Sequence, residues 1–381
     1  MQCKRFAAAL LAAICLLVVT PLQASGFDDA GVKAPAAVLM EAQTGKVLYE
    51  KAPHEQRPCA SVTKVMTLLL VMEAIDSGTL SLTDSVAASA HAASMGGSDI
   101  WLKEGEVMSV DNLIKATVVA SANDAAVVLA ERVAGSEDAF VQKMNEKAKA
   151  LGMKDTVFKN CNGLDEDGHV TSAYDVAVMS RMLIQHKEIF RYTTIWMDNV
   201  RDGATQLVNT NKLLKSYQGI TGLKTGTTSK AGSCISATAE RDGMSLVASV
   251  LGAGNTDDRF STARALLDYG FAGWSMVDLP QPEQALAAVP VANGMLPEVS
   301  AHADLTGKVL VPKGKEGSIT CTVEMQSGVK APVQAGQQLG RVQYTLGEEP
   351  LCTRPVVAGE AVEAISFSRL VRLLGYNLFY I

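Results

Sequence analysis

The sequence predicts an α+β fold, in which one antiparallel sheet is flanked by helices and is followed by a smaller all-β sandwich domain and a C-terminal amphipathic helix. Residues 36–51 alternate around a Thr44–Gly45 turn, which is the pattern of a β-hairpin. Residues 219–253 have strand patterns, and residues 241–243 form the turn between the last two strands. Because helical patterns lie between these regions, we expect one sheet with strands from both ends of the domain.

The helices are predicted from apolar spacing and from residues that favour helix ends. They span residues 61–77, 109–119, 122–134, 136–151, 173–186 and 257–269, the last ending at Gly270.

The composition changes near residue 276, where short strand-like runs broken by Gly and Pro begin. These runs include KVLVPKG, SITCTVEM, GRVQYTLG and RPVVAGEAV. They predict a β-sandwich domain over residues 276–363, so the first domain covers residues 25–275.

Residues 364–381 (AISFSRLVRLLGYNLFYI) are predicted to form an amphipathic helix on the membrane surface. Its apolar residues at helical spacing are Phe367, Leu370, Val371, Leu374 and Leu378. Arg369 and Arg372 lie off this stripe and disfavour a membrane-spanning helix. The alternative is a terminal helix that docks on its own protein.

Composition and charge favour a folded globular protein. Of its 381 residues, 48% are hydrophobic and 19% are charged. The net charge of −6 offers no global positive field, so we expect no nucleic-acid partner.

The N-terminus has the features of a secretory signal peptide over residues 1–24. Lys4 and Arg5 precede a short apolar run, and small residues surround Ala24. The alternative is an uncleaved anchor, which the shortness of the run disfavours. We therefore expect an exported protein at the outer face of the cytoplasmic membrane.

The cysteine and histidine spacing predicts neither a disulfide framework nor a metal site. After signal removal five scattered cysteines remain: Cys59, Cys161, Cys234, Cys321 and Cys352. Cys321 and Cys352 could pair. There is no CxxC or HExxH motif, and we expect no metal or organic cofactor.

The first chemical motif is the pair Ser61 and Lys64, three residues apart at the start of a predicted helix, in CASVTKVMT. Residues at this spacing are neighbours on one helix face. A desolvated lysine can act as the base that activates a serine nucleophile. The backbone N–H of Ser61 could stabilise an oxyanion. The alternative is a helix-capping serine beside a solvated lysine.

Two further motifs strengthen the catalytic interpretation. Ser121 and Asn123 lie two apart in SAN, where a hydroxyl can pass a proton and an amide can hold a peptide carbonyl. The alternative for this pair is a helix cap.

The third motif is Lys224-Thr225-Gly226, followed by Thr227, at the start of a strand region. Lys224 would add positive charge near the serine, and the two threonines can hold a carboxylate. Gly226 would leave room for a substrate that pairs with the strand. The alternative is a surface loop.

The ordered set of three motifs resembles the β-lactamase and penicillin-binding protein group. The stretches RPCASVTKVMT, VASANDAAVVLAE, NGLDEDGHVTSAYDVAVMSR, TNKLL and GLKTGTTSKAG resemble the low-molecular-mass penicillin-binding proteins, which are serine D-alanyl-D-alanine carboxypeptidases. The resemblance covers roughly residues 27–381 and implies a β-lactamase/transpeptidase-like first domain.

The resemblance implies that Ser61 attacks the penultimate D-alanine of a peptidoglycan pentapeptide and that Lys64 takes its proton. Ser121 and Lys64 would shuttle protons to the leaving D-alanine, and Asn123 would orient the peptide. The terminal carboxylate would be held by Lys224, Thr225 and Thr227. β-Lactam antibiotics would trap Ser61 as an ester.

Five other positions have weaker signals. Arg259 matches a family arginine near the substrate carboxylate, or forms a surface ion pair. The loop 94–106 either flanks the site or is a connection. His169 is better interpreted as structural than as a base, and Glu166 has no catalytic counterpart in this family. Cys59 is interpreted as packing.

Two other functions compete with the carboxypeptidase. A β-lactamase is disfavoured by SAN in place of SDN and by the β domain and tail. A catalytically idle penicillin-binding sensor would not need an activated serine. A cytoplasmic amidase with the same Ser–Lys spacing is excluded if the signal peptide is real.

Overall fold

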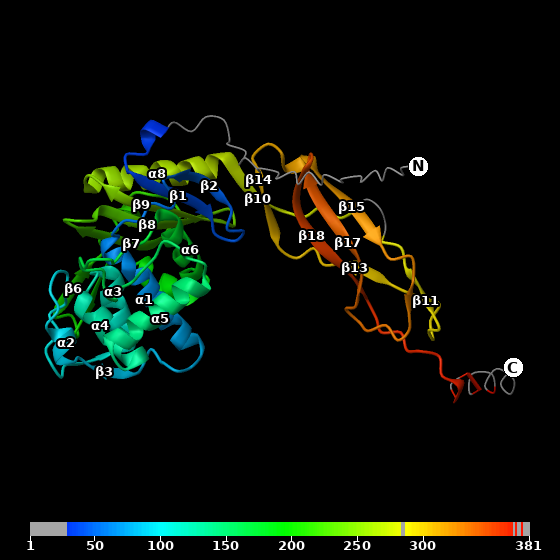
Figure 1. Cartoon of the computed structure of the whole chain (residues 1–381), viewed down its shortest axis with the longest axis horizontal. Helices are drawn as coiled ribbons and strands as arrows, with labels where there is room; N and C mark the ends of the chain where they lie inside the picture. The colour runs from blue at the N-terminus through cyan, green and yellow to red at the C-terminus, as the bar shows by residue number, and fades with distance from the viewer. Residues whose placement is uncertain (1–28, 283–285, 369, 372–374, 376–381) are drawn as a thin grey trace, which may run out of the picture.

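The computed structural model describes residues 29–282, 286–368, 370–371 and 375, and it confirms the α+β fold class. Figure 1 shows a larger part, with helices around a sheet, and a smaller part made of strands.

The central sheet is antiparallel, with the strand order β2-β1-β9-β8-β7. Its strands are β1 (Ala36–Glu41), β2 (Val47–Lys51), β7 (Ile220–Thr228), β8 (Gly232–Arg241) and β9 (Met244–Ala253). The N-terminal hairpin joins the later strands through pairing of β1 with β9, as predicted. Asp242 and Gly243 form a two-residue turn between β8 and β9, and both have positive φ, as a type I′ turn requires.

Helices cover both faces of this sheet. In β1, Val38 packs with the helical cluster on one face, whereas Leu39 packs with α8 (Thr256–Gly273) on the other. The helices of the first face are α1 (Lys64–Asp76), α3 (Val110–Val119), α4 (Asn123–Ala134), α5 (Glu137–Ala150) and α6 (Ala173–Leu183). Short elements complete this part: α2 (Ala90–Ala93), α7 (Phe190–Thr193), the β3 (Ser85–Ala87) and β4 (Val107–Ser109) pair, and the β5 (Met197–Val200) and β6 (Thr205–Val208) pair.

Two predicted helix ends were wrong. Ser61 lies in a 3₁₀ turn (Ala60–Thr63), and α1 begins only at Lys64. α8 continues past Gly270, because this glycine brings the helix close to the sheet and does not end it. A Cβ at Gly270 would lie 2.5 Å from a methyl of Leu246 and 3.0 Å from one of Leu39.

The smaller part consists of short strands around its own apolar core. It contains β10 (Trp274–Asp278), β11 (Val289–Ala292), β12 (Glu298–Val299), β13 (Ala301–Ala303), β14 (Lys308–Pro312), β15 (Ile319–Met325), β16 (Val329–Lys330), β17 (Gln338–Leu346) and β18 (Glu349–Ala358). The chain passes between cores within β10, where Trp274 and Met276 pack with the larger part and Val277 with the smaller.

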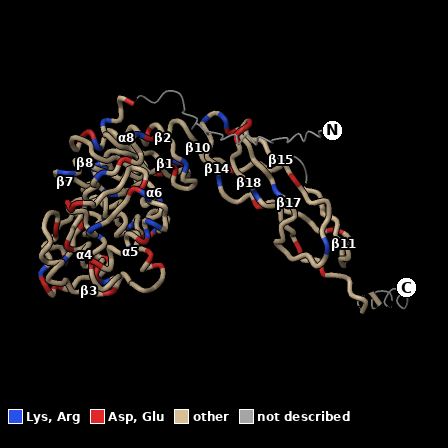
Figure 2. The backbone as a smooth tube through the Cα atoms, viewed as in Figure 1, with Lys and Arg blue, Asp and Glu red and all other residues tan. Residues whose placement is uncertain are grey.

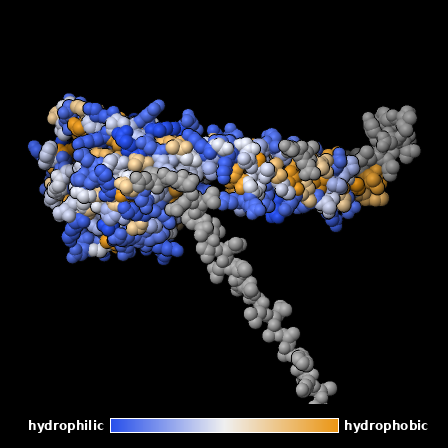
Figure 3. All heavy atoms as spheres, turned by 90° about the horizontal axis from the view of Figure 1, so that it is seen from above, coloured by the Kyte–Doolittle hydropathy of each residue, from blue (hydrophilic) through white to orange (hydrophobic). Residues whose placement is uncertain are grey.

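The predicted signal peptide, residues 1–24, lies outside the described residues. Of the predicted tail helix over 364–381, only part is described. Its apolar residues Ile365, Phe367, Leu370 and Val371 are exposed, and Figure 3 shows apolar side chains gathered at this end. Within the described ranges, no helix is long and apolar enough to cross a membrane. The amphipathic helix remains a prediction.

The strand register separates Cys321 from Cys352. Both lie opposite Tyr344 on β17, on its two sides. Two strand spacings amount to about 10 Å, which is too far for a disulfide.

The part of the chain that the structure describes holds no His, Cys, Asp and Glu cluster that could bind a metal. Figure 2 shows acidic and basic residues interspersed along both parts.

Candidate active site

The amine of Lys64 lies at the centre of a buried polar cluster. Its Nζ is 3.0 Å from Ser61 Oγ, 2.5 Å from Asn123 Oδ1 and 2.7 Å from the backbone oxygen of Asn162. Lys64 is fully buried, whereas Ser61 is partly exposed. The 3₁₀ turn and the first turn of α1 therefore bring the two predicted residues together, with the serine at the surface of the cluster.

These contacts define how a neutral Lys64 would be oriented. The oxygens of Asn123 and Asn162 can only accept hydrogen bonds, so the two N–H groups of a neutral amine would point at them. The amide of Asn123 is fixed in this orientation because its Nδ2 donates to the backbone oxygen of Gly96 at 2.6 Å. The remaining lone pair then faces Ser61 Oγ and can accept its proton.

Burial makes this neutral form accessible at ordinary pH. Desolvation lowers the pKa of Lys64 to about 7, against the weaker opposing effect of nearby acidic groups such as Asp99 and Asp124. The desolvated lysine expected from the sequence agrees with burial as the main cause. The pKa of Lys224 is itself lowered by burial and then by repulsion from Lys64 and Arg259.

The turn at Ser121 connects the two lysines. Lys224 Nζ, on β7, donates to Ser121 Oγ at 2.8 Å and to the backbone oxygen of Thr225 at 2.9 Å. Ser121 has φ +62°, an unfavourable backbone conformation for a residue with a side chain. Since Asn123 accepts from Lys64, the SAN turn contacts both lysines.

Gly226 allows β7 to lie directly against the nucleophile turn. A Cβ at this position would lie 2.7 Å from the backbone nitrogen of Ser61 and 2.7 Å from the oxygen of Cys59. The sequence predicted room for a substrate here. In the structure, a side chain at Gly226 would first push β7 away from the turn that carries Ser61.

Arg259 reaches the same strand from α8. Its Nη1 lies 3.0 Å from Thr227 Oγ1 and 3.2 Å from the oxygen of Gly226. The guanidinium is buried, its Nε has no hydrogen-bond partner, and no carboxylate within the described ranges forms an ion pair with it. The surface ion pair considered from the sequence is therefore not formed here. Thr225 Oγ1 lies 2.6 Å from Thr210 Oγ1, and Thr227 is exposed.

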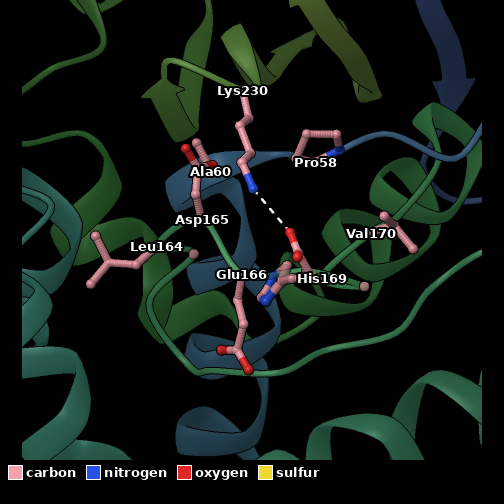
Figure 4. Close-up of a pocket in the computed structure, with 11 residues that line it drawn as sticks. Pro58, Ala60, Leu164, Asp165, Glu166, His169, Val170 and Lys230 are labelled. Atoms are coloured by element: carbon pink, nitrogen blue, oxygen red, sulfur yellow. Dashed lines mark hydrogen bonds and ion pairs between the residues drawn. The ribbon is translucent and has the colours of Figure 1, made fainter.

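His169 and Glu166 lie outside this cluster. His169 Nδ1 accepts from the backbone N–H of Lys159, so Nε2 carries the proton and donates to Thr63. Burial lowers the pKa of His169 to about 4. Both residues line a pocket of about 170 Å³ beside Ala60, shown in Figure 4 with the ion pair of Lys230 and Asp167. His169 thus has a structural role.

Cys59 is buried beside the nucleophile turn. Its Sγ lies 3.3 Å from Thr63 Oγ1, and burial raises the pKa of the thiol to about 12. A thiol with so high a pKa is a packing group, as the sequence indicated.

Sequence reasoning missed the backbone oxygen of Asn162 and the hydroxyl of Thr210. A carbonyl ligand leaves no side-chain signal, and only Glu166 was considered in this part of the sequence. Thr210 lies in TNKLL, a stretch that contributed only to the overall resemblance.

The fold and the site together define a class of protein. A serine beside a desolvated lysine, with a second lysine on an adjacent antiparallel strand, is the arrangement of a serine acyltransferase.

The chain belongs to the D-alanyl-D-alanine carboxypeptidase family of serine peptidases, peptidase S11, which matches residues 23–255. Residues 274–364 match the C-terminal domain of penicillin-binding protein 5. The protein is therefore a serine-type D-alanyl-D-alanine carboxypeptidase.

Individual relatives cover nearly the whole chain. It is 39% identical to D-alanyl-D-alanine carboxypeptidase DacF of Bacillus subtilis, over 96% of each chain, and 33% identical to DacC of Escherichia coli, over 88% of this chain and 86% of that one. Penicillin-binding protein 5 of Haemophilus influenzae superposes with a TM-score of 0.76 at 28% identity, over 87% of this chain and 98% of that one. Ampicillin-bound penicillin-binding protein D2 of Listeria monocytogenes superposes with a TM-score of 0.58 at 36% identity, over 63% of this chain and 98% of that one.

Proposed function

We propose that Ser61 is the nucleophile and Lys64 its general base in the removal of the terminal D-alanine from peptidoglycan stem pentapeptides. Ser61 Oγ attacks the carbonyl carbon of the penultimate D-alanine while its proton passes to Lys64 Nζ. The peptide bond breaks, D-alanine leaves with a proton delivered through Lys64 and Ser121, and the acyl group remains on Ser61. Water then hydrolyses the ester.

The hydrogen-bonding pattern of Lys64 carries this proposal. Two acceptor-only oxygens hold its N–H groups, and its free lone pair is directed at Ser61 Oγ. A solvated lysine would have neither this orientation nor a pKa near 7.

The substrate carboxylate would be held by residues of β7 and by Arg259. Lys224, Thr225 and Thr227 supply donors along β7, and Arg259 adds a buried positive charge without a carboxylate partner in the described chain. The backbone N–H groups of Ser61 and Thr227 would stabilise the oxyanion, and Asn123 would orient the peptide.

We also propose that β-lactams acylate Ser61, because they present a strained amide and a carboxylate in the arrangement of the D-alanyl-D-alanine end. The ampicillin-bound state of the Listeria relative supports this proposal.

The remaining proposals concern location. Residues 1–24 would direct export, and residues 364–381 would bind the membrane surface through the exposed apolar residues around Phe367 and Val371. The peptidase domain (25–275) would then be held off the membrane by the β domain (276–363), which we propose acts as a spacer.

The test is D-alanine release from diacetyl-Lys-D-Ala-D-Ala by the chain from residue 25 onward, beside Ser61→Ala. Both proteins are also labelled with fluorescent penicillin. We expect release and labelling by the wild type and neither by the variant.

The other outcomes separate the competing functions. Labelling without release would indicate a penicillin-binding sensor. Rapid turnover of penicillin, with no release from the peptide, would indicate a β-lactamase.

A further inference from the structure

Trp101 has an unusual backbone conformation for a bulky residue. Its φ is +55°, in the left-handed region that glycine and asparagine normally occupy. Its side chain is nevertheless 79% exposed, so the indole gains little burial in return. A strained and exposed aromatic residue points to a contact made with something outside the chain.

The strain is imposed from both sides of the residue. The backbone N–H groups of Ile100 and Leu102 donate to the buried carboxylate of Asp124, at 3.1 and 2.9 Å. On the other side Arg201 donates to the oxygen of Ile100 at 2.8 Å and to Glu106 Oε1 at 2.6 Å. With its neighbours fixed, residue 101 has to project outward.

The indole borders an open hollow with polar walls. The hollow has a volume of about 680 Å³ and is lined by Ile100, Trp101, Lys103, Glu104, Gly105, Glu106 and Arg201. Lys103 and Glu104 are exposed and can donate and accept hydrogen bonds. A flat apolar ring beside such groups suits a ligand that has an apolar face and a polar rim.

This hollow is connected to the active site through one loop. The backbone oxygens of Gly96 and Ser98 accept from the Nδ2 and the backbone N–H of Asn123, at 2.6 and 2.7 Å. Asn123 in turn contacts Lys64, and Asp124 holds the backbone beside Trp101. In Figure 1, α2 and β3 lie at the opposite end of the molecule from the described C-terminal residues. The loop follows α2, so a membrane at the C-terminus would lie far from it.

We infer that the Trp101 hollow binds an N-acetylated amino sugar of the glycan strand to which the stem peptide is attached. The C–H face of the sugar ring stacks on the indole, and its hydroxyl and amide groups bond with Lys103 and Glu104. A lipid is a poorer fit, because it would need a continuous apolar surface and these neighbours are charged. This inference rests on the proposed function of the Ser61 site.

Trp101→Gly is the informative variant, because glycine relieves the backbone strain while removing the ring. It is compared with the wild type on diacetyl-Lys-D-Ala-D-Ala and on soluble, uncrosslinked glycan chains that carry pentapeptides. We expect kcat/KM on the glycan-linked substrate to fall about tenfold, mainly through KM, and to stay within about twofold on the free peptide. The melting temperature should not fall.

Trp101→Phe serves as the matched control and should retain most of the preference for the glycan-linked substrate. Equal effects of Trp101→Gly on both substrates, or none on either, would overturn the inference.

A binding measurement separates this inference from the proposed function. Glycan chains stripped of their peptides are titrated into the protein, and the tryptophan emission of the wild type is compared with that of Trp101→Phe, which keeps Trp196 and Trp274. We expect a saturable change only in the wild type. If neither peptide substrate releases D-alanine, the proposed function fails, and this titration still decides the sugar site.

Discussion

The two parts of the molecule bury different kinds of side chain. Every buried polar or charged residue of the described chain lies between Glu41 and Thr262, in the larger part. The core of the β part is apolar apart from Tyr344, whose hydroxyl donates to the backbone oxygen of Pro280. Burying polar groups costs free energy unless they are hydrogen-bonded. The larger part can keep its buried polar groups because they are hydrogen-bonded, and those around Lys64 belong to the candidate active site, whereas the core of the β part contains almost none.

The largest test of this contrast is Lys64→Met, which keeps the length of the side chain and removes the base. We expect acylation by fluorescent penicillin to slow by about 10²–10⁴-fold. Methionine cannot donate to the buried oxygens of Asn123 and Asn162, so the free energy of unfolding should fall by about 1–3 kcal/mol. Near-normal acylation by a folded variant would show that Lys64 is not the base.

The pH profile gives the next effect. Below the pKa of Lys64, about 7, the fraction of neutral amine falls tenfold per pH unit, so the acylation rate should fall in parallel. Above pH 7 the rate should level off. The measurement is the acylation rate between about pH 5 and pH 9, and a flat profile would contradict a lysine base.

The same pKa has a consequence for stability with a definite sign. Between pH 7 and the ordinary lysine value of 10.5, the unfolded chain binds the proton that the folded Lys64 has released. The contribution of Lys64 to the free energy of unfolding therefore rises with pH across this window. Lys64→Met should remove that part of the slope.

Arg259→Ala tests the carboxylate end of the site. Loss of a buried, charged hydrogen bond should lower kcat/KM for the peptide by about 10–100-fold. Arg264, half-buried on the same helix α8 and hydrogen-bonded to Ser216, provides the matched control, and Arg264→Ala should stay within about twofold. A substrate amidated at its C-terminus should lose activity with the wild type and little more with Arg259→Ala. A full additional loss would assign Arg259 a structural role.

The sequence predicted most of this fold because its signals are local. The type I′ turn at Asp242–Gly243 and the alternation of β1 need only neighbouring residues to be recognised. The prediction that α8 ends at Gly270 was wrong. This glycine is needed for close contact with Leu246 on β9, and a tertiary contact of this kind cannot be recognised from neighbouring residues. The short β3–β4 and β5–β6 pairs lack a long alternating pattern and were not predicted.

In the site, the sequence predicted most of the side chains but not the backbone oxygen that contacts Lys64. Ser61, Lys64, Ser121, Asn123 and Lys224 were predicted from three motifs. The fold places them in two hydrogen-bonded groups, Ser61–Lys64–Asn123 and Ser121–Lys224, which meet at the SAN turn. The Asn162 oxygen that orients Lys64 could not be identified, because any residue supplies a carbonyl. The sequence indicated that Lys64 could be desolvated. How deeply Lys64 is buried, and therefore how far its pKa falls, depends on the packing of helices that are far apart in the sequence.

The smallest expected effect on catalysis is in the β part. Leu339 is fully buried in its core, so Leu339→Ala should destabilise that part by about 2–5 kcal/mol. Thr322, exposed on β15, is the control, and Thr322→Ala should change stability by less than about 0.5 kcal/mol. In thermal unfolding, Leu339→Ala should lower the temperature of one transition while kcat/KM on the free peptide stays within about twofold. If kcat/KM falls with stability, the β part supports the active site directly, and the contrast between a catalytic part and a spacer no longer holds.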